Sequence, residues 1–375
     1  MRVIVVGGGI VGASAAFHLA RRGVATTLVD AGHRGRATSA GAGVVFPWPF
    51  PWDPAPLRAF TLAAAAHYPD LMAELADDGH ATGYQAVAGM AVSAAPAVAD
   101  REHALLDQLA ARPGHAGPAR VRRLARGEPA RRVPVLPEHL AGVAFDGMAR
   151  LDGRLARGAL VDAAEERGLR RIGGDAELLG DGARVTGVRV GGEDLPADAV
   201  VVAAGAWTAR LLAPFGVRVP VFPVRGQIAH VALPTTDTRD WPVVRFADHD
   251  RFMVAFPPNR VVLNATSEPE AGFDHRVTVA GLRQVLADAV GTAPGLAEAT
   301  VLETRVGFRP GSRDGLPLLG PVESLAGVVV ATGLGPSGLT LGPYQGALAA
   351  RLAVGEEAGV DLAAFRPDRP GTPAR

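Results

Sequence analysis

The order of hydrophobic and polar residues is clearest over the first thirty positions. Residues 3–6, Val-Ile-Val-Val, form a continuous apolar run, which is typical of a strand buried on both faces of a parallel sheet. Residues 13–22 carry apolar side chains at helical spacing, and residues 26–29 form a second apolar run. The pattern therefore predicts a strand, a helix and a second strand, the three parts of a βαβ unit.

Apolar runs and spacings predict further elements along the rest of the chain. Helices are expected at residues 54–80, 101–112 and 339–352, and strands at 84–92, 198–203, 228–233, within 252–265 and from 328 onward. The Pro-, Gly- and Arg-rich residues 112–137 are expected to form a surface stretch, and the Pro-rich tail 366–375 to be disordered.

Glycines fill the turn of the N-terminal βαβ unit, in the sequence Gly7-Gly-Gly9-Ile10-Val11-Gly12. Gly7 permits a tight turn, Gly9 lets a pyrophosphate approach the backbone, and Gly12 lets the helix pack on the strand. The unpaired N–H groups at the helix N-terminus favour phosphate. Asp30, eighteen residues after Gly12 and followed by Ala31, is placed for a ribose hydroxyl. The unit predicts a dinucleotide site, and by itself it does not choose between NAD and FAD.

Composition excludes several other partners. The 375 residues are enough for two closely packed domains. Lys+Arg and Asp+Glu both total 38, so there is no basic field for nucleic acid. No apolar stretch approaches the roughly 20 residues of a membrane span, and no signal-peptide pattern follows Met1. We therefore expect a cytoplasmic protein with neither a nucleic-acid partner nor a membrane span.

The chain contains neither cysteine nor lysine. Disulfides, thiolate nucleophiles, Cys-held metals and cysteinyl flavin are therefore excluded, as are the P-loop lysine and a lysine Schiff base. No metal site is predicted. Redox chemistry would require a bound organic cofactor.

Five later segments carry a resemblance to a known superfamily. Residues 35–45 are rich in small and hydroxyl side chains and, taken alone, could be an ordinary Gly/Ala loop. The other segments are residues 198–207, 223–227 (Pro-Val-Arg-Gly-Gln), 306–320 and 328–340. Together with the N-terminal unit, they resemble the FAD-dependent D-amino-acid oxidase, glycine oxidase and sarcosine oxidase superfamily. The resemblance covers nearly the whole chain, and residues 50–140 are the least similar.

The resemblance implies an α/β protein with a Rossmann-like FAD-binding domain, split in sequence, and an antiparallel-sheet substrate domain with helices. The FAD-binding domain would comprise residues 1–45, 140–215 and 305–365, and the substrate domain residues 46–139 and 216–304. FAD would be bound non-covalently. Beyond the βαβ unit, the residues expected to contact it are Arg36, Thr38, Ser39, Ala42, Gly43, Val44, Ala204, Gly205, Trp207, Gly335, Pro336, Ser337, Gly338, Leu339 and Thr340.

The segment before the last helix also has a physical interpretation. An apolar strand from Val328 meets a glycine loop and then a helix that begins near Leu339. The N-terminus of that helix, at Gly338, Leu339 and Thr340, would stabilise the negative charge on the N1–C2=O edge of reduced flavin.

Arg309 is the candidate for substrate binding, because it matches the superfamily's carboxylate-binding arginine and a guanidinium binds a carboxylate through two hydrogen bonds. The alternative is a structural Arg309 paired with Asp314, although Arg313 suits a structural role better. Glycine oxidase-like proteins tend to have a tyrosine where this chain has Phe252, which puts plain glycine and small D-amino acids in doubt.

Two further candidates lie elsewhere. Trp48 belongs to the aromatic and proline segment 45–52, which could wall the substrate pocket or simply pack in the core. His230 is the histidine best placed in sequence to approach the site, although a histidine on a strand is more often a sheet residue than a base.

The function implied is oxidation of the C–N bond of a small amine or amino acid to an imine, by hydride transfer to flavin N5. The electron acceptor stays open, because relatives similar to sarcosine oxidase activate oxygen with a lysine that this chain lacks, whereas other relatives do without it. The alternatives are a 2-hydroxy-acid dehydrogenase of the same fold, a non-catalytic flavoprotein subunit and an NAD enzyme.

Overall fold

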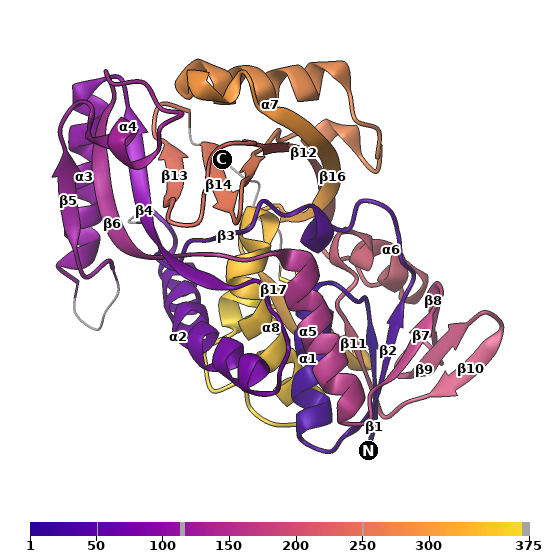
Figure 1. Ribbon diagram of the computed structural model, residues 1–375. Coiled ribbons are helices and arrows are strands. Elements are labelled where there is room, and N and C mark those ends of the chain that lie inside the picture. The colour runs from indigo at the N-terminus through magenta and orange to yellow at the C-terminus, as the bar shows by residue number, and fades with distance from the viewer. Residues whose placement is uncertain (51, 113–116, 250, 370–375) are drawn as a thin grey trace.

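The computed structural model describes residues 1–375 except 51, 113–116, 250 and 370–375. Three sheets organise these residues, and we call them the parallel sheet, the small sheet and the large sheet. In Figure 1 the parallel sheet and its helices fill the lower part of the molecule, and the large sheet lies above it under helix α7. This arrangement of mixed helices and sheets confirms the expected α/β class.

The parallel sheet contains the N-terminal βαβ unit. Its strand order is β17-β18-β11-β1-β2-β7, and only β17 runs antiparallel to its neighbour. The strands span β1 Arg2–Val6, β2 Ala25–Asp30, β7 Arg170–Gly173, β11 Ala199–Val202, β17 Leu318–Val322 and β18 Leu325–Thr332. Segments from three distant parts of the sequence therefore meet in one sheet.

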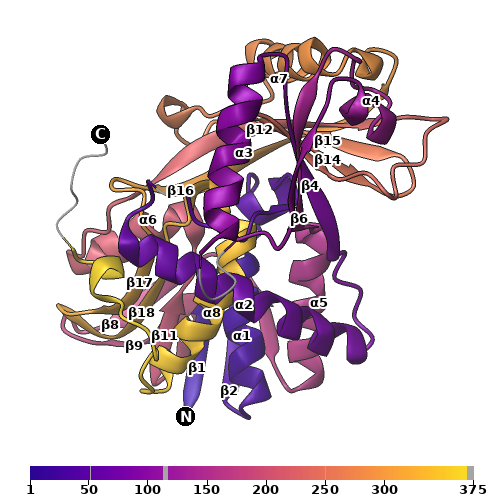
Figure 2. The same ribbon diagram turned by 90° about the vertical axis from the view of Figure 1, so that its left-hand side faces the viewer.

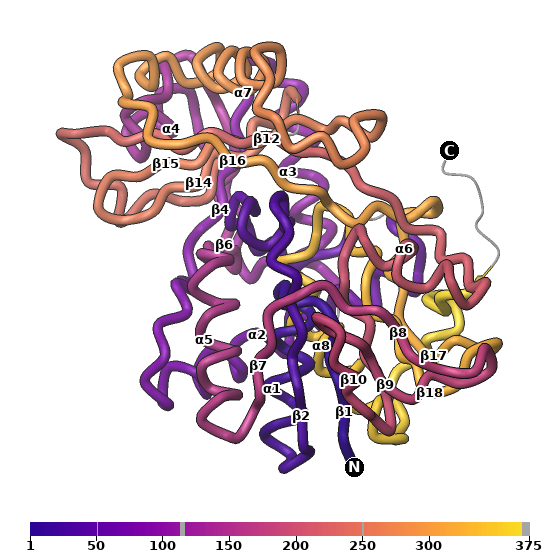
Figure 3. The backbone as a smooth tube through the Cα atoms, turned by 90° about the vertical axis from the view of Figure 1, so that its right-hand side faces the viewer, coloured from indigo at the N-terminus to yellow at the C-terminus, as the bar shows by residue number. Residues whose placement is uncertain are grey.

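Both faces of the parallel sheet are covered, which explains why β1 is apolar throughout. Val3 and Val5 pack against the helices, whereas Ile4 and Val6 pack against the small sheet. The helices on the first face are α1 Ile10–Arg21, α2 Ala55–Asp77, α5 Gly153–Glu166 and α8 Gly338–Ala353. The small sheet has the order β10-β9-β8 and spans β8 Ala176–Gly180, β9 Val185–Val190 and β10 Glu193–Pro196. Figure 3 shows it beside β1 and β2.

Helices α1 and α8 approach each other closely because small residues line their contact. A Cβ added to Gly346 would lie 2.4 Å from the carbonyl oxygen of Val11. The Ser14 hydroxyl donates a hydrogen bond of 2.6 Å to the carbonyl oxygen of Pro343. The N-termini of α1 and α8 consequently lie near each other at one edge of the parallel sheet.

The large sheet follows the order β16-β12-β15-β14-β13-β4-β6-β3, with β5 also paired to β6. Its pairs are antiparallel except β13 with β4, so the expected antiparallel sheet is in fact mixed. Its strands span β3 Val44–Val45, β4 Gln85–Ser93, β5 Val121–Leu124, β6 Ala141–Arg150, β12 Val221–Ala232, β13 Val243–Phe246, β14 Arg251–Phe256, β15 Arg260–Leu263 and β16 Thr300–Ser312. Helices α3 Pro96–Ala110, α4 Glu128–Arg132, α6 Thr208–Leu212 and α7 Val279–Thr292 complete the fold, and α7 and α3 flank the large sheet in Figure 2.

The sheet membership of two strands bears on the expected domain boundaries. Strand β6 and most of β16 fall within ranges that the sequence assigned to the FAD-binding part, yet both pair within the large sheet. The boundaries at 140 and 305 remain a prediction, and these strands connect the two expected parts.

Two expectations about irregular segments hold only in part. The stretch 112–137 contains β5 and α4, and its Val133, Val135 and Leu136 are buried in the core beneath α7. The apolar side chains of these three residues favour burial, although Pro, Gly and Arg surround them in the sequence. In the tail, Arg369 bonds to both oxygens of the Asp314 carboxylate at 2.7 and 2.8 Å, so residues 366–369 are anchored. The remainder of the expected tail, 370–375, lies outside the described residues.

Among the described residues, no helix has the length and apolar character needed to cross a membrane.

The contact between α1 and α2 contains the buried His18 and the partly buried His67. The rings of His18 and His67 lie 5.4 Å apart, and neither Nε2 has a hydrogen-bond partner among the described residues. Burial, followed by the charges of His67, Arg21 and Arg22, lowers the pKa of His18 to about 3.

Acidification should therefore destabilise the fold through His18. The unfolded chain takes up this proton near pH 6.5, whereas the folded chain resists it until about pH 3, so stability falls as pH drops through that window. Between pH 7.5 and 5, His18 should contribute a loss of roughly 2 kcal/mol, at about 1.4 kcal/mol per pH unit below 6.5. Urea unfolding of wild type and His18→Leu at both pH values checks this. The gap in unfolding free energy between the two proteins should change between pH 7.5 and pH 5. An unchanged gap would contradict the prediction.

Candidate cofactor and substrate site

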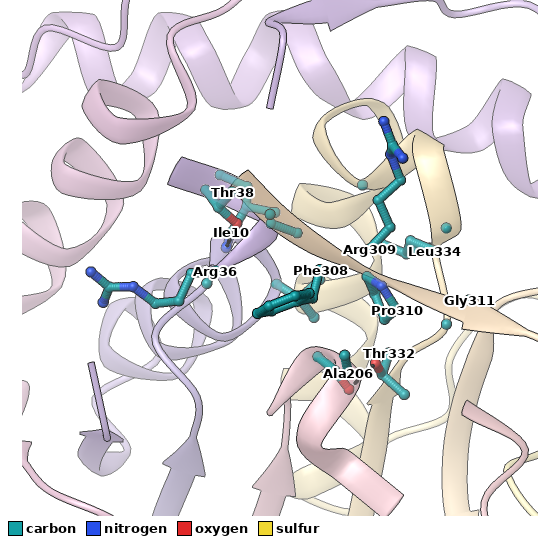
Figure 4. A pocket seen from close by; sticks show the side chains of 18 of the residues that line it. Ile10, Arg36, Thr38, Ala206, Phe308, Arg309, Pro310, Gly311, Thr332 and Leu334 are labelled. Carbon is teal, nitrogen blue, oxygen red and sulfur yellow. Dashed lines mark hydrogen bonds between the residues drawn. The ribbon is translucent and has the colours of Figure 1, made fainter. Parts of the chain in front are cut away.

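One large cavity runs along the carboxyl edge of the parallel sheet and continues under the large sheet. Its volume is about 1340 Å³, which exceeds the roughly 300–1000 Å³ typical of a drug-sized ligand. The cavity is thus large enough for a dinucleotide together with a small substrate. Figure 4 shows Arg36, Thr38 and Ile10 on one side of it and Thr332 and Leu334 on the other.

The glycine turn forms the first wall of the cavity, and its geometry requires glycine. Gly7 has φ +105°, and a Cβ there would lie 2.4 Å from the carbonyl oxygen of Ala203. A Cβ on Gly12 would lie 1.8 Å from the carbonyl oxygen of Gly7. Helix α1 can begin only where it does because neither position carries a side chain, and its N-terminus opens onto the cavity.

Polar groups surround that helix N-terminus. The Thr38 hydroxyl accepts a hydrogen bond of 2.9 Å from the N–H of Ile10, and Arg36 Nη1 lies 2.8 Å from the Asp30 carboxylate. Arg157 of α5 donates from Nε to the carbonyl oxygen of Gly8 at 2.8 Å, and its Nη2 lies 3.4 Å from Asp30. Arg157 was not predicted, because its helix lies far along the chain and carries no motif.

Segment 174–178 also lines the cavity, next to Asp30 and Ala31, and was likewise missed. It follows β7 at the carboxyl edge of the parallel sheet. Since ligands of such sheets bind at that edge, its position after a strand was a usable signal.

Almost all residues expected to bind the cofactor line the cavity. The exceptions are Gly12, which packs under the turn, and Ser39, whose carbonyl oxygen accepts hydrogen bonds of 3.3 Å from Arg154 and Arg305. The lining positions are Gly7, Gly9, Ile10, Val11, Asp30, Ala31, Arg36, Thr38, Ala42, Gly43, Val44, Ala204, Gly205, Trp207, Gly335, Pro336, Ser337, Gly338, Leu339 and Thr340.

The far end of the cavity lies where the N-terminus of α8 meets β16. Thr340 accepts a hydrogen bond of 3.2 Å from the N–H of Phe46, and the carbonyl oxygen of Leu339 accepts one of 2.7 Å from Tyr68. These bonds fix the start of α8 against the aromatic segment. Phe308 of β16 packs edge-on against Trp207 with ring centroids 5.9 Å apart.

Arg309 lines the same end of the cavity, and its side chain points away from that of Phe308 (Figure 4). Its Nη1 donates a hydrogen bond of 3.0 Å to the carbonyl oxygen of Thr266. Burial, followed by the charge of Arg251, lowers the pKa of Arg309. Among the described residues no carboxylate forms an ion pair with Arg309, and Asp314, the alternative partner, is bonded to Arg369. Arg309 thus presents a partly unsatisfied guanidinium to the cavity.

Other side chains near Arg309 determine the character of this end. Arg251, Phe252, Asn264 and Ser267 line it, and Arg251 also contacts Asp288 of α7 at 3.3 Å. The Asn264 side-chain oxygen accepts a hydrogen bond of 2.8 Å from the N–H of Phe252, which fixes the two strands relative to each other. Phe252 lines the same cavity as Arg309, and its role in substrate binding stays a prediction.

The aromatic candidate and the histidine candidate have different outcomes. Trp48 is buried, lines the cavity and packs against Phe46 and Phe145, so it combines the two alternatives of pocket wall and core packing. His230 is buried but does not line the cavity, and neither ring nitrogen has a hydrogen-bond partner among the described residues. Burial and then Arg305 lower its pKa to about 4. The expectation that His230 approaches the site was wrong, because it lies two residues beyond Ile228, the last β12 residue on the cavity.

These residues fit FAD. Two helix N-termini open onto one cavity, the glycine turn leaves a cradle that any Cβ would fill, and a carboxylate lies at the end of β2. The cavity continues past this cradle to the half-buried Arg309, which has no carboxylate partner among the described residues, as a joint site for a dinucleotide and a carboxylate substrate requires.

Comparison with known proteins agrees with this geometry. The family model described as FAD dependent oxidoreductase (DAO) matches residues 2–352. The crystal structure of iminodiacetate oxidase from Chelativorans sp. BNC1 has a TM-score of 0.93 and 40% identity, covering 98% of this chain and 99% of that chain. Glycine oxidase from Geobacillus kaustophilus has a TM-score of 0.86 and 30% identity, covering 99% and 100%. An uncharacterized oxidoreductase, YurR of Bacillus subtilis (strain 168), is 38% identical over 97% of this chain and 98% of its own length.

Proposed function

The chain belongs to the DAO family of FAD-dependent oxidoreductases, and from this premise we propose that it oxidises the C–N bond of a small amine carrying at least one carboxylate. The observation that carries the proposal is the half-buried guanidinium of Arg309, which has no carboxylate partner among the described residues and faces the cavity. FAD, when bound, supplies the acceptor for the two electrons that leave the C–N bond.

The residues of the chain would position the substrate. Arg309 would hold its carboxylate through charged hydrogen bonds, while Phe252 and Trp48 would form apolar walls that exclude water from the reacting carbon. Among the described lining residues, the neighbourhood of Arg309 contains no histidine, glutamate or tyrosine. We infer that the amine loses its proton before it binds, so that the site acts by orientation more than by proton transfer.

The substrate class favoured is a secondary amine with two carboxylates, for which iminodiacetate is the probe. The similar solved structure at 40% identity is an iminodiacetate oxidase, and Arg251 gives the cavity a second guanidinium near Arg309. Phe252 lacks the hydroxyl that plain glycine would be expected to need. Incubation with iminodiacetate should give glyoxylate and glycine in equal amounts. Release of glyoxylate from glycolate but not from iminodiacetate would instead support the hydroxy-acid alternative.

Arg251 should discriminate diacids from monoacids. We expect Arg251→Leu to lower kcat/KM for iminodiacetate about fivefold to tenfold, since a partly exposed charge contributes on the order of 1 kcal/mol. Turnover of sarcosine, which has one carboxylate, should change less than about twofold. The matched control is Arg283→Leu, which removes an exposed charge from α7 outside the cavity. Equal losses with both substrates would contradict a diacid-specific role.

A further inference from the structure

A partly buried carboxylate, that of Glu268, lies close enough to Arg309 for their charges to interact. Glu268 comes after residues 264–267, which follow β15 and line the cavity, but it does not line the cavity itself. Its carboxylate accepts hydrogen bonds from Arg225 Nε at 3.1 Å, from Arg225 Nη2, from Gln227 Nε2 at 2.7 Å and from the Thr266 hydroxyl. One carboxylate thus gathers three side chains from two neighbouring segments.

These contacts also explain the Pro-Val-Arg-Gly-Gln segment of β12. Arg225 is buried, and its Nη1 contacts Asp274 at 2.8 Å, so it lies between two carboxylates. Gln227 binds Thr278 at the start of α7 as well as Glu268. Gly226 leaves room for the Arg309 guanidinium, since a Cβ there would lie 2.6 Å from its Nη1.

Hydrogen bonds between Gln227 and Thr266 connect this cluster to Arg309. The N–H of Thr266 donates to the carbonyl oxygen of Gln227 at 3.1 Å, and the N–H of Gln227 donates to the Thr266 hydroxyl at 3.0 Å. Thr266 is therefore held on both its backbone and its side chain. Its own carbonyl oxygen is the acceptor for Arg309 Nη1.

We propose that Glu268 is a positioning residue, which acts through Thr266 to fix the Arg309 guanidinium for the substrate carboxylate. Arg225 and Gln227 serve the same purpose by holding Glu268. The proposal rests on the proposed function, because it assumes that Arg309 binds a carboxylate.

The hydrogen bonds that Glu268 accepts require a charged carboxylate. Partial burial raises its pKa, but the hydrogen bonds from Arg225, Thr266 and Gln227 outweigh burial and hold the pKa below its ordinary value. A glutamine at this position would keep one acceptor oxygen and turn an amide N–H₂ toward the donors of Arg225. Repulsion between that amide and Arg225 would displace residue 268, and with it the acceptor of the Thr266 hydroxyl, although the apolar core would be unchanged.

The test measures binding of thiodiacetate and (methylthio)acetate, carboxylates that have sulfur in place of the reacting nitrogen, to the FAD-loaded protein by calorimetry. Glu268→Gln should raise the dissociation constants of both at least tenfold, while FAD content and melting temperature remain close to wild type. Asp274→Asn is the matched control, because Asp274 is the other carboxylate on Arg225 but contacts neither Thr266 nor Gln227. It should change binding less than about twofold.

Three outcomes decide the matter. Unchanged binding in Glu268→Gln, with binding lost in Arg309→Met, would overturn the positioning role and leave the proposed function intact. Equal weakening in Glu268→Gln and Asp274→Asn would also overturn it, since it would show a general structural effect. Unchanged binding in Arg309→Met would overturn the anchor and the inference together. If Glu268→Gln does not fold, Thr266→Val, which removes one donor to Glu268, takes its place with the same expectations.

Discussion

Gly12→Ala is expected to give a protein that retains no FAD after purification. The added methyl group would lie 1.8 Å from the carbonyl oxygen of Gly7 and 3.0 Å from its carbonyl carbon, so α1 or the glycine turn must move. Either shift removes the N-terminus of α1 from the wall of the cavity, where its N–H groups would face the pyrophosphate. Flavin absorbance near 450 nm relative to protein absorbance at 280 nm measures the loss.

The matched control for this substitution is Gly158→Ala. Gly158 also lies inside a helix, α5, but a Cβ there would meet no atom within 4 Å. Alanine should stabilise that helix by roughly 0.5–1 kcal/mol and leave FAD binding unchanged. If Gly12→Ala and Gly158→Ala bind FAD equally well, the close approach of α1 to the glycine turn has no role in holding the cofactor.

Arg309→Met is expected to lower kcat/KM for iminodiacetate by about 10-fold to 150-fold. Hydrogen bonds to a charged group contribute roughly 1.5–3 kcal/mol, and each 1.36 kcal/mol corresponds to one factor of ten. The loss should appear mainly in KM, since the carboxylate is bound alike before and during reaction. Steady-state kinetics of the FAD-loaded protein measure it.

Arg313→Met provides the control for Arg309→Met. Arg313 lies four residues further along, is exposed and does not line the cavity, so its removal changes the net charge equally. Its kinetics should stay within about twofold of wild type. An unchanged KM in Arg309→Met, or a similar loss in both variants, would rule out Arg309 as the anchor.

The sequence predicted the parallel core well because its signals are local. Residues 3–6 are apolar on both faces of a covered sheet, and the glycines beside them have steric roles visible in their spacing. Helix α1 begins three residues earlier than its apolar spacing indicated, since Gly9 already has the backbone conformation of a helix cap.

The parts that the sequence did not predict depend on contacts between distant segments. Arg157 reaches Gly8 from a helix with no motif, and Glu268 joins β12 to the residues that support Arg309. Neither position differs in local pattern from an ordinary surface charge. His230 was predicted to approach the site and does not. Its strand, β12, lies beside the cavity, but the His230 side chain lies beyond the end of the cavity.

The most direct test of the account is anaerobic titration of the purified yellow protein with iminodiacetate, followed near 450 nm. We expect rapid bleaching in the wild type, much slower bleaching in Arg309→Met at the same concentration, and wild-type behaviour in Arg313→Met. A protein that stays yellow with iminodiacetate and with a panel of other carboxylated amines would contradict the proposed oxidation of a C–N bond.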